Sequence, residues 1–141
     1  MHEKIIGIIR SNDLAVLATS FQDRPHCSLM AYAADEKCRN IYMITGQDSQ
    51  KFQNIMANPH VSILLDTRAR SMAMENIQAL TISGEYTAVP ENEQKNLKEL
   101  IVKKHPQLKT LAAKPDAIVI KIQIDSFLLL DGVNDAYYLK A

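Results

Sequence analysis

A Thr, a Gly, a Ser and a Lys, all residues that commonly bind phosphate, lie close together in the stretch TGQDSQK from Thr45 to Lys51. The apolar pattern predicts a helix that starts here, and the first turn of a helix has unpaired N–H groups and a partial positive charge. Two interpretations follow. Asp48 or Ser49 caps the helix, as these residue types usually do, or the stretch holds an anion such as phosphate.

The histidines and cysteines form no recognisable catalytic or metal-binding pattern. The four histidines are scattered without an i, i+4 pair, and Cys27 and Cys38 form no CxxC motif. We therefore predict no metal site and two reduced thiols in a cytoplasmic protein. Cys27 is interpreted as a small buried hydrophobe rather than a nucleophile.

Length and composition indicate one globular domain over residues 1–141. Hydrophobic residues make up 47% of the chain and charged residues 23%, as in soluble proteins. Sixteen basic residues balance 16 acidic ones, so no excess positive charge attracts nucleic acid or anionic lipid. The apolar N-terminal run is interrupted by Arg10 and Asp13, too early for a signal sequence or a membrane span. We expect neither nucleic acid nor a membrane as a partner.

The hydrophobic pattern predicts strands at 13–20, 26–34, 41–45, 60–67, 77–89 and 117–132, and helices at 2–11, 48–57 and 91–105. The runs 26–34 and 41–45 are expected to pair as an antiparallel hairpin. In the last helix, Leu97, Leu100 and Ile101 are expected to face inward. Gly84 within a strand pattern indicates a bulge or a close backbone approach. Six strands joined mostly by hairpins favour a mainly β fold, a small antiparallel barrel with helices packed on its ends.

The order of these segments resembles the pyridoxamine 5'-phosphate oxidase-like, FMN-binding split-barrel superfamily. The resemblance covers roughly residues 13–89, and its most specific part is a strand, the T…SQK segment, a helix and the strand NPHVSILLD. It implies a six-stranded antiparallel FMN-binding split barrel. It also implies a homodimer with FMN at the subunit interface and a small-molecule redox substrate.

Carried onto this sequence, the resemblance makes Thr45, Ser49 and Lys51 the phosphate ligands. Gln50 stands where such proteins often have Arg. Two hydroxyls and one ammonium suit a phosphate, so the flanking pattern favours anion binding over simple capping.

The same resemblance assigns the flavin ring to the second strand. Ser28, Leu29 and Met30 would run along the edge of the isoalloxazine ring, with Ile44 nearby. Leu80 of the partner subunit is expected to close the pocket. Because side chains alternate along a strand, Leu29 and Met30 should lie on opposite faces.

The sequence departs from true pyridoxamine phosphate oxidases in three places. Ser28 and Gln50 replace basic residues, which predicts weaker flavin retention, and the C-terminal segment lacks an Arg-x-His substrate signature. Oxidation of vitamin B6 is therefore not expected. Open alternatives are a flavin-dependent oxidoreductase, a non-catalytic flavin-binding stress or redox sensor, a deazaflavin- or haem-binding relative, and a dimeric module without a cofactor. No side chain stands out as a catalytic acid or base.

Overall fold

Side chains alternate between the interior and the outer surface along the strands, and this alternation turns the apolar runs into one curled sheet. In β1 (Leu14–Phe21), Ala15, Leu17 and Thr19 are buried, and the residues between them are partly exposed. The structure is a computed structural model that describes residues 1–70 and 73–141. The other strands are β2 (Arg24–Ala31), β3 (Ala33–Ala34), β4 (Asn40–Gly46), β5 (His60–Asp66), β6 (Gln78–Thr87), β7 (Ala117–Asp131) and β8 (Asp135–Lys140).

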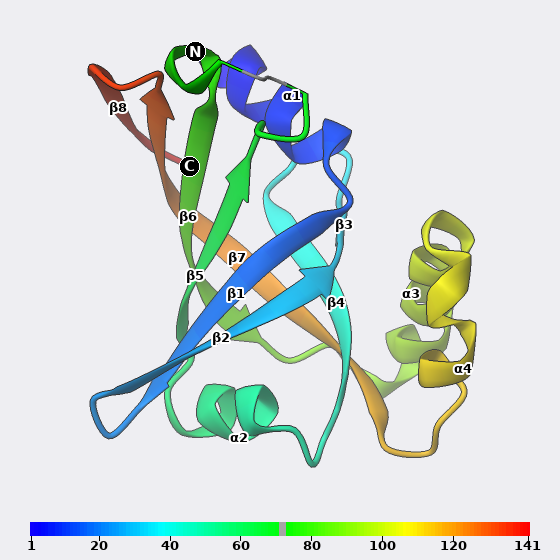
Figure 1. Cartoon of the computed structure of the whole chain (residues 1–141). Helices are drawn as coiled ribbons and strands as arrows, with labels where there is room; N and C mark the ends of the chain where they lie inside the picture. Colours follow the sequence, from blue (N-terminus) through cyan, green and yellow to red (C-terminus); the bar gives the residue numbers. More distant parts are fainter. Residues whose placement is uncertain (71–72) are drawn as a thin grey trace.

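The strands form an antiparallel sheet in the order β2-β1-β5-β6-β7-β4-β3, with β8 beside β7. Strand β7 is long enough to pair with two strands along one of its edges. Its first half pairs with β4 and its second half with β8. Strand β6 pairs along the other edge of β7. The sheet curls into the split barrel seen in Figure 1.

The two edges of the sheet, β2 and β3, are consecutive in the chain and are joined by Tyr32. Tyr32 is fully buried, and its hydroxyl donates to the carbonyl of Ile9. The carbonyl of Tyr32 accepts from Nε2 of His105 at 2.7 Å. The described strand ladder does not continue from β2 to β3. At this seam the barrel is instead stabilised by the hydrogen bonds of Tyr32 with Ile9 and His105.

Gly84 marks a bulge between β6 and β7. The register shifts between Ser83 and Gly84, so that Asp125 has no partner across the ladder. A Cβ at Gly84 would lie 2.6 Å from the carbonyl oxygen of Gln123, closer than side chains approach. Glycine is therefore required at this approach of two backbones, and the bulge prediction is confirmed.

The helices cover the ends and one side of the barrel. They are α1 (His2–Ser11), α2 (Gln50–Ala57), α3 (Glu91–Lys104) and α4 (Lys109–Ala112), with 3-10 turns η1 (Met74–Asn76) and η2 (Pro106–Leu108). Figure 1 shows α1 and α2 at opposite ends of the barrel, and α3 with α4 beside β4 and the start of β7. No helix among the described residues has the length and apolar character needed to cross a membrane.

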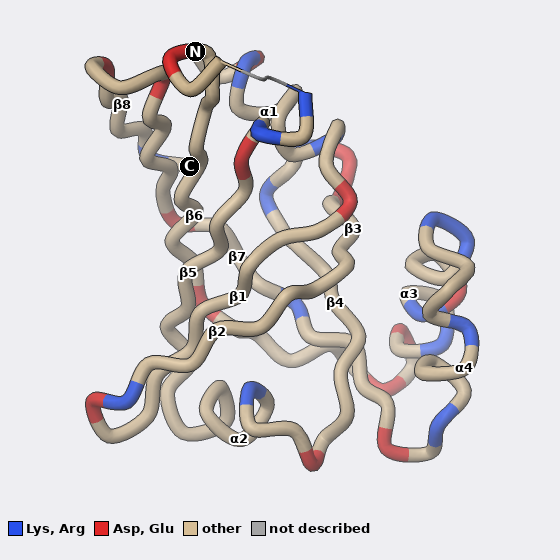
Figure 2. Tube along the Cα trace, viewed as in Figure 1, with Lys and Arg blue, Asp and Glu red and all other residues tan. Residues whose placement is uncertain are grey.

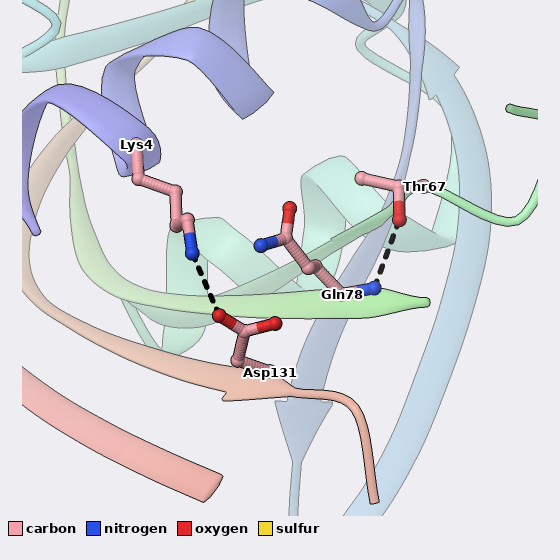
Figure 3. A network of polar contacts seen from close by, with 4 residues as sticks. All are labelled: Lys4, Thr67, Gln78 and Asp131. Atoms are coloured by element: carbon pink, nitrogen blue, oxygen red, sulfur yellow. Dashed lines mark hydrogen bonds and ion pairs between the residues drawn. The ribbon is translucent and has the colours of Figure 1, made fainter. Parts of the chain in front are cut away.

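Charged residues gather on helices and loops, and Figure 2 shows Lys and Arg along α3 and α4. One surface ion pair links α1 to the sheet, with Nζ of Lys4 2.7 Å from Oδ2 of Asp131 (Figure 3). Hydrogen bonds from Lys4 and then Gln78 lower the pKa of Asp131. Beside it, the backbone N–H of Gln78 donates to the hydroxyl of Thr67 at 2.8 Å.

The predicted mainly β split barrel is confirmed, but four details were wrong. Most of the run 26–34 pairs with β1, and only Ala33 and Ala34 pair with β4. Strand β8 was not predicted. Leu100 is 55% exposed rather than facing inward, and Cys27 is exposed rather than buried, because Leu97 and Ile101 define the inner face of α3 and Cys27 lies on the outer face of the sheet.

Candidate cofactor site

Helix α2 starts at Ser49, which caps it. Oγ of Ser49 accepts from the backbone N–H of Phe52 at 3.2 Å, and the N–H of Ser49 donates to the carbonyl of Gly46 at 3.1 Å. The hydroxyls of Ser49 and the buried Thr45 are 3.0 Å apart. A hydroxyl has one donor hydrogen and two acceptor lone pairs, so Ser49 can cap the helix and still donate to a bound anion. The two interpretations of this stretch are compatible.

A pocket of about 230 Å³ opens beside this helix start. Its polar end is formed by Thr45, Gly46, Ser49 and Lys51. Its apolar sides come from three elements, namely β2 with Leu29, Met30 and Ala31, β4 with Ile44, and the η2–α4 segment with Leu108 and Leu111. The structure therefore brings together six of the nine residues that the sequence singled out: Leu29, Met30, Ile44, Thr45, Ser49 and Lys51.

Leu29 and Met30 point to opposite faces of β2, as expected. Leu29 is 68% exposed on the outer face and Met30 is buried. Both still reach the pocket, because β2 is an edge strand and the pocket wraps around its end.

Three of the nine residues do not line the pocket. The side chain of Gln50 donates to Oδ1 of Asn54 at 2.8 Å, and Ser28 pairs with Leu17 on the inner face of β2. Leu80 is fully buried in the core of its own chain. A side chain enclosed in this way cannot close the pocket of a second copy.

Sequence reasoning missed Ala31, Gly46, Leu108 and Leu111. Ala31 and Gly46 extend strand segments that were already singled out. Leu108 and Leu111 follow Pro106 in a segment of short turns without a clear periodicity. The sequence carries no signal that this segment folds back toward β2 and β4.

Lys51 is the single charged residue among those lining the pocket, and neither of the ion pairs within residues 1–70 and 73–141 includes it. Two carboxylates approach the same end. A Cβ at Gly46 would lie 2.8 Å from Oδ1 of Asp48 and 3.2 Å from Oδ2 of Asp116. The polar end therefore offers one cation and two hydroxyls, and the nearby carboxylates of Asp48 and Asp116 leave it without an excess of positive charge.

A larger groove of about 610 Å³ lies between α3 and α4. Lysine and glutamate side chains, together with Ala112 and Ala113, form most of its walls. Its buried polar residue, Gln94, is already satisfied, since its amide exchanges two hydrogen bonds with the backbone of Val119. We therefore place the candidate cofactor site in the smaller pocket, where the hydroxyls and Lys51 meet an apolar slot.

Comparison with known proteins agrees with this architecture. The family model described as pyridoxamine 5'-phosphate oxidase matches residues 1–131. A pyridoxamine 5'-phosphate oxidase homologue of Schizosaccharomyces pombe is 28% identical over 156 aligned positions, covering 87% of this chain and 81% of that protein. General Stress Protein 26 of Bacillus anthracis superimposes with a TM-score of 0.75 at 25% identity, covering 99% of this chain and 98% of that one.

Two more distant structures share the fold. A haem-binding protein of Mycobacterium smegmatis has a TM-score of 0.87 at 14% identity, covering 99% of this chain and 57% of that one. An FAD-binding protein of Mesorhizobium loti has a TM-score of 0.73 at 18% identity, covering 90% and 91%. Proteins with this fold thus include flavin binders, stress proteins and haem binders. From the family match over residues 1–131 and the split barrel, the chain belongs to the pyridoxamine 5'-phosphate oxidase family.

Proposed function

We propose that this chain is an FMN-binding flavoprotein of the cytoplasm that acts as an oxidoreductase on a small molecule. One observation carries the proposal. An apolar slot between β2, β4 and the η2–α4 segment adjoins a hydroxyl pair and one lysine at the start of α2. This arrangement matches a molecule with a flat apolar ring at one end and a phosphate at the other.

The polar end fits a phosphate in its donor chemistry. The Thr45–Ser49 pair offers one hydroxyl hydrogen, since the other is used between the two oxygens, Lys51 offers an ammonium, and the first turn of α2 adds its partial positive charge. Ser49 caps the helix through its acceptor lone pairs, which leaves its hydrogen for the ligand. A single cation predicts modest affinity for the phosphate.

The apolar end fits a ring but is incomplete in one chain. The pocket volume of about 230 Å³ is below the roughly 300–1,000 Å³ typical of ligand sites. We propose that a second copy of the chain completes the pocket, in a homodimer with the cofactor at the interface. Leu80 is not part of this proposal, because its side chain is enclosed in its own core.

The outer face of the sheet supports such a dimer. One row of side chains runs across it in register, from Leu29 through Val16, Leu64, Thr81 and Leu128 to Tyr138. Leu64 is 40% exposed, Leu128 is 38% exposed and Tyr138 is 63% exposed. An apolar row of this length is typical of an interface. It includes Leu29, which also lines the pocket, so a partner on this face would reach the site.

Bound FMN would supply hydride or electron transfer. The residues of the chain would bind the phosphate, orient the ring and exclude water. Of the side-chain types that bind haem iron, namely His, Cys, Met and Tyr, the pocket lining contains Met30 alone. The hydroxyl pair and Lys51 beside an apolar slot fit a flavin phosphate and ring better than a haem held by one methionine. We do not propose oxidation of vitamin B6, because the C-terminal segment lacks the Arg-x-His signature.

Titration of FMN and riboflavin against the wild type and Lys51→Ala tests the proposal. A charge-assisted hydrogen bond contributes about 1.5–3 kcal/mol, so Lys51→Ala should weaken FMN roughly tenfold to hundredfold. Riboflavin lacks the phosphate and should bind equally to both. The exposed Lys37 in the β3–β4 loop gives a matched control, Lys37→Ala. Equal loss of both flavins in Lys51→Ala would refute a phosphate site.

Absorbance and reduction distinguish the alternatives. Flavin bands in the purified protein support the proposal, whereas a Soret band would indicate haem and a featureless spectrum an empty module. Bleaching of the flavin by NAD(P)H would favour an oxidoreductase over a non-catalytic flavin binder or redox sensor.

Sedimentation tests the dimer. We expect Leu64→Glu to give monomers, while Leu100→Glu, on the 55% exposed Leu100 of α3, should remain dimeric. A wild-type chain that stays monomeric at micromolar concentration would contradict the shared site.

A further inference from the structure

A chain of polar side chains, buried at Thr19 and Asn54 and exposed at Gln50, connects the barrel interior to the start of α2. Nδ2 of Asn54 donates to Oγ1 of Thr19 at 3.1 Å, and Oδ1 of Asn54 accepts from Nε2 of Gln50 at 2.8 Å. Asn54 is 3% exposed and Thr19 is 2% exposed. The chain therefore runs from the inner face of β1 to the first residue of α2.

Polar groups at this position are unexpected for packing alone. Asn54 lies between Phe52 and Ile55, which belong to the apolar core, and burial of an amide is unfavourable unless its hydrogen bonds are made. Hydrogen bonds restrict distance and angle more tightly than apolar contacts do. The bonds of Asn54 thus fix the rotation and height of α2 over the end of β1.

This restraint acts next to the polar end of the pocket. Gln50 stands between Ser49 and Lys51 in the sequence, and its side chain is held toward Asn54 and does not line the pocket. Ser49 and Lys51 do line the pocket. The bond to Asn54 therefore fixes the first turn with Gln50 directed away from the ligand and its two neighbours directed toward it.

We propose that Asn54 is a positioning residue for the phosphate group of the cofactor. Acting through Gln50 and Thr19, it holds the first turn of α2 so that the Thr45–Ser49 hydroxyl pair and Lys51 converge on one point. The inference rests on the proposed binding of FMN. It assigns a role in ligand selection to a side chain that does not touch the ligand.

The same helix provides a matched control at its other end. Nδ2 of Asn58 donates to the carbonyl of Ser20 at 3.2 Å, and Oδ1 of Asn58 accepts from the N–H of His60 at 3.2 Å. Asn58 thus also connects α2 to β1, but it does so at the C-cap, at the opposite end of the helix from Ser49. Loss of Asn58 should lower stability without moving the first turn.

The experiment measures dissociation constants for FMN and riboflavin, together with the melting temperature, for the wild type and four variants. Asn54→Leu removes both bonds, and Thr19→Val removes the acceptor at nearly constant volume. Thr19→Ser keeps the hydroxyl, and Asn58→Ala is the control. A misplaced neutral hydrogen bond corresponds to about a threefold to tenfold change in affinity.

We expect the preference for FMN over riboflavin to fall by about threefold to tenfold in Asn54→Leu and in Thr19→Val. It should be retained in Thr19→Ser and in Asn58→Ala, although Asn58→Ala melts at a lower temperature. If Asn54→Leu does not fold, the near-isosteric Thr19→Val decides the question.

Two results would overturn the inference, and they are distinguishable. A wild-type protein that binds FMN no better than riboflavin refutes the phosphate site itself and the inference with it. A wild-type preference that persists in Thr19→Val, or that falls equally in Asn58→Ala, refutes the positioning role and leaves the phosphate site standing.

Discussion

The side-chain amide of Gln94 hydrogen-bonds to the backbone at the start of β7, as a neighbouring strand would. Strand β6 ends at Thr87, which pairs with Lys121, so Val119 lies beyond its reach. Oε1 of Gln94 accepts from the N–H of Val119 at 2.9 Å, and Nε2 donates to its carbonyl at 3.1 Å. These two bonds dock α3 on the sheet and thereby hold the η2–α4 segment that follows it.

Gln94→Leu keeps most of the side-chain volume but leaves both backbone groups of Val119 without a partner. Each buried unpaired polar group lowers the free energy of unfolding by about 1–3 kcal/mol. The two backbone groups of Val119 together would therefore lower it by at most roughly 2–6 kcal/mol. Gln94 borders the open groove between α3 and α4, where water can reach the freed groups. We therefore expect a loss of about 2–4 kcal/mol, a large part of the 5–15 kcal/mol typical of a domain.

Urea unfolding followed by circular dichroism measures this loss. Lys95→Leu, on the neighbouring exposed residue that lines the same groove, should change the free energy of unfolding by less than about 0.5 kcal/mol. Gln94→Glu should be unstable at neutral pH and recover in acid, since only the protonated acid can donate to the carbonyl of Val119. A change below about 1 kcal/mol for Gln94→Leu would refute the view that this amide completes the sheet.

Three further outcomes are expected. Leu111→Ala should weaken FMN and riboflavin alike by about fivefold in the same titration, since it shortens an apolar wall of the pocket. Gly84→Ala should destabilise the barrel by about 1–3 kcal/mol in urea, because the new Cβ would meet backbone; no change would mean that β6 and β7 separate freely. Burial raises the pKa of Asp35, but hydrogen bonds from Asn40 and Arg39 outweigh it and hold the pKa below its ordinary value. Asp35 thus contributes stability above its unfolded pKa and loses it as the pH falls through its folded pKa. The difference in urea midpoint between wild type and Asp35→Ala should be largest at neutral pH and shrink as the pH is lowered through the acid range; a constant difference would contradict this.

Local patterns predicted most of the fold. The apolar runs at 13–20 and 117–132, the end of the helix at residue 57 and the bulge at Gly84 are properties of short segments, and each appears where expected. The pairing of 26–34 was wrong because adjacency along the chain favours a hairpin with the next strand. The two-residue turn at Gln22 and Asp23, both with positive φ, instead pairs β2 with β1. Strand β8 had a signal in Asp131–Gly132, a dipeptide typical of hairpins.

The candidate site was predictable where it depends on one continuous stretch. The resemblance assigned Thr45, Ser49 and Lys51 within one stretch where a strand leads into a helix start, and it assigned Leu29 and Met30 within one strand. Leu108 and Leu111 reach the pocket through tertiary packing of short turns after Pro106. Such packing cannot be predicted from a local sequence pattern. The enclosure of Leu80 likewise depends on its neighbours across the sheet, Leu65 and Leu129.

The seam at Tyr32 has a consequence for how the protein avoids aggregation. Strand β2 is an edge strand, and such an edge exposes backbone groups that can pair with another chain. The pocket lies along the end of this edge, at Leu29, Met30 and Ala31. A flavin bound there would cover part of the edge much as an added strand covers a sheet. The cofactor-free protein is then the form most exposed to edge-to-edge association. If the chain binds FMN as proposed, light scattering should show less self-association with FMN than without it.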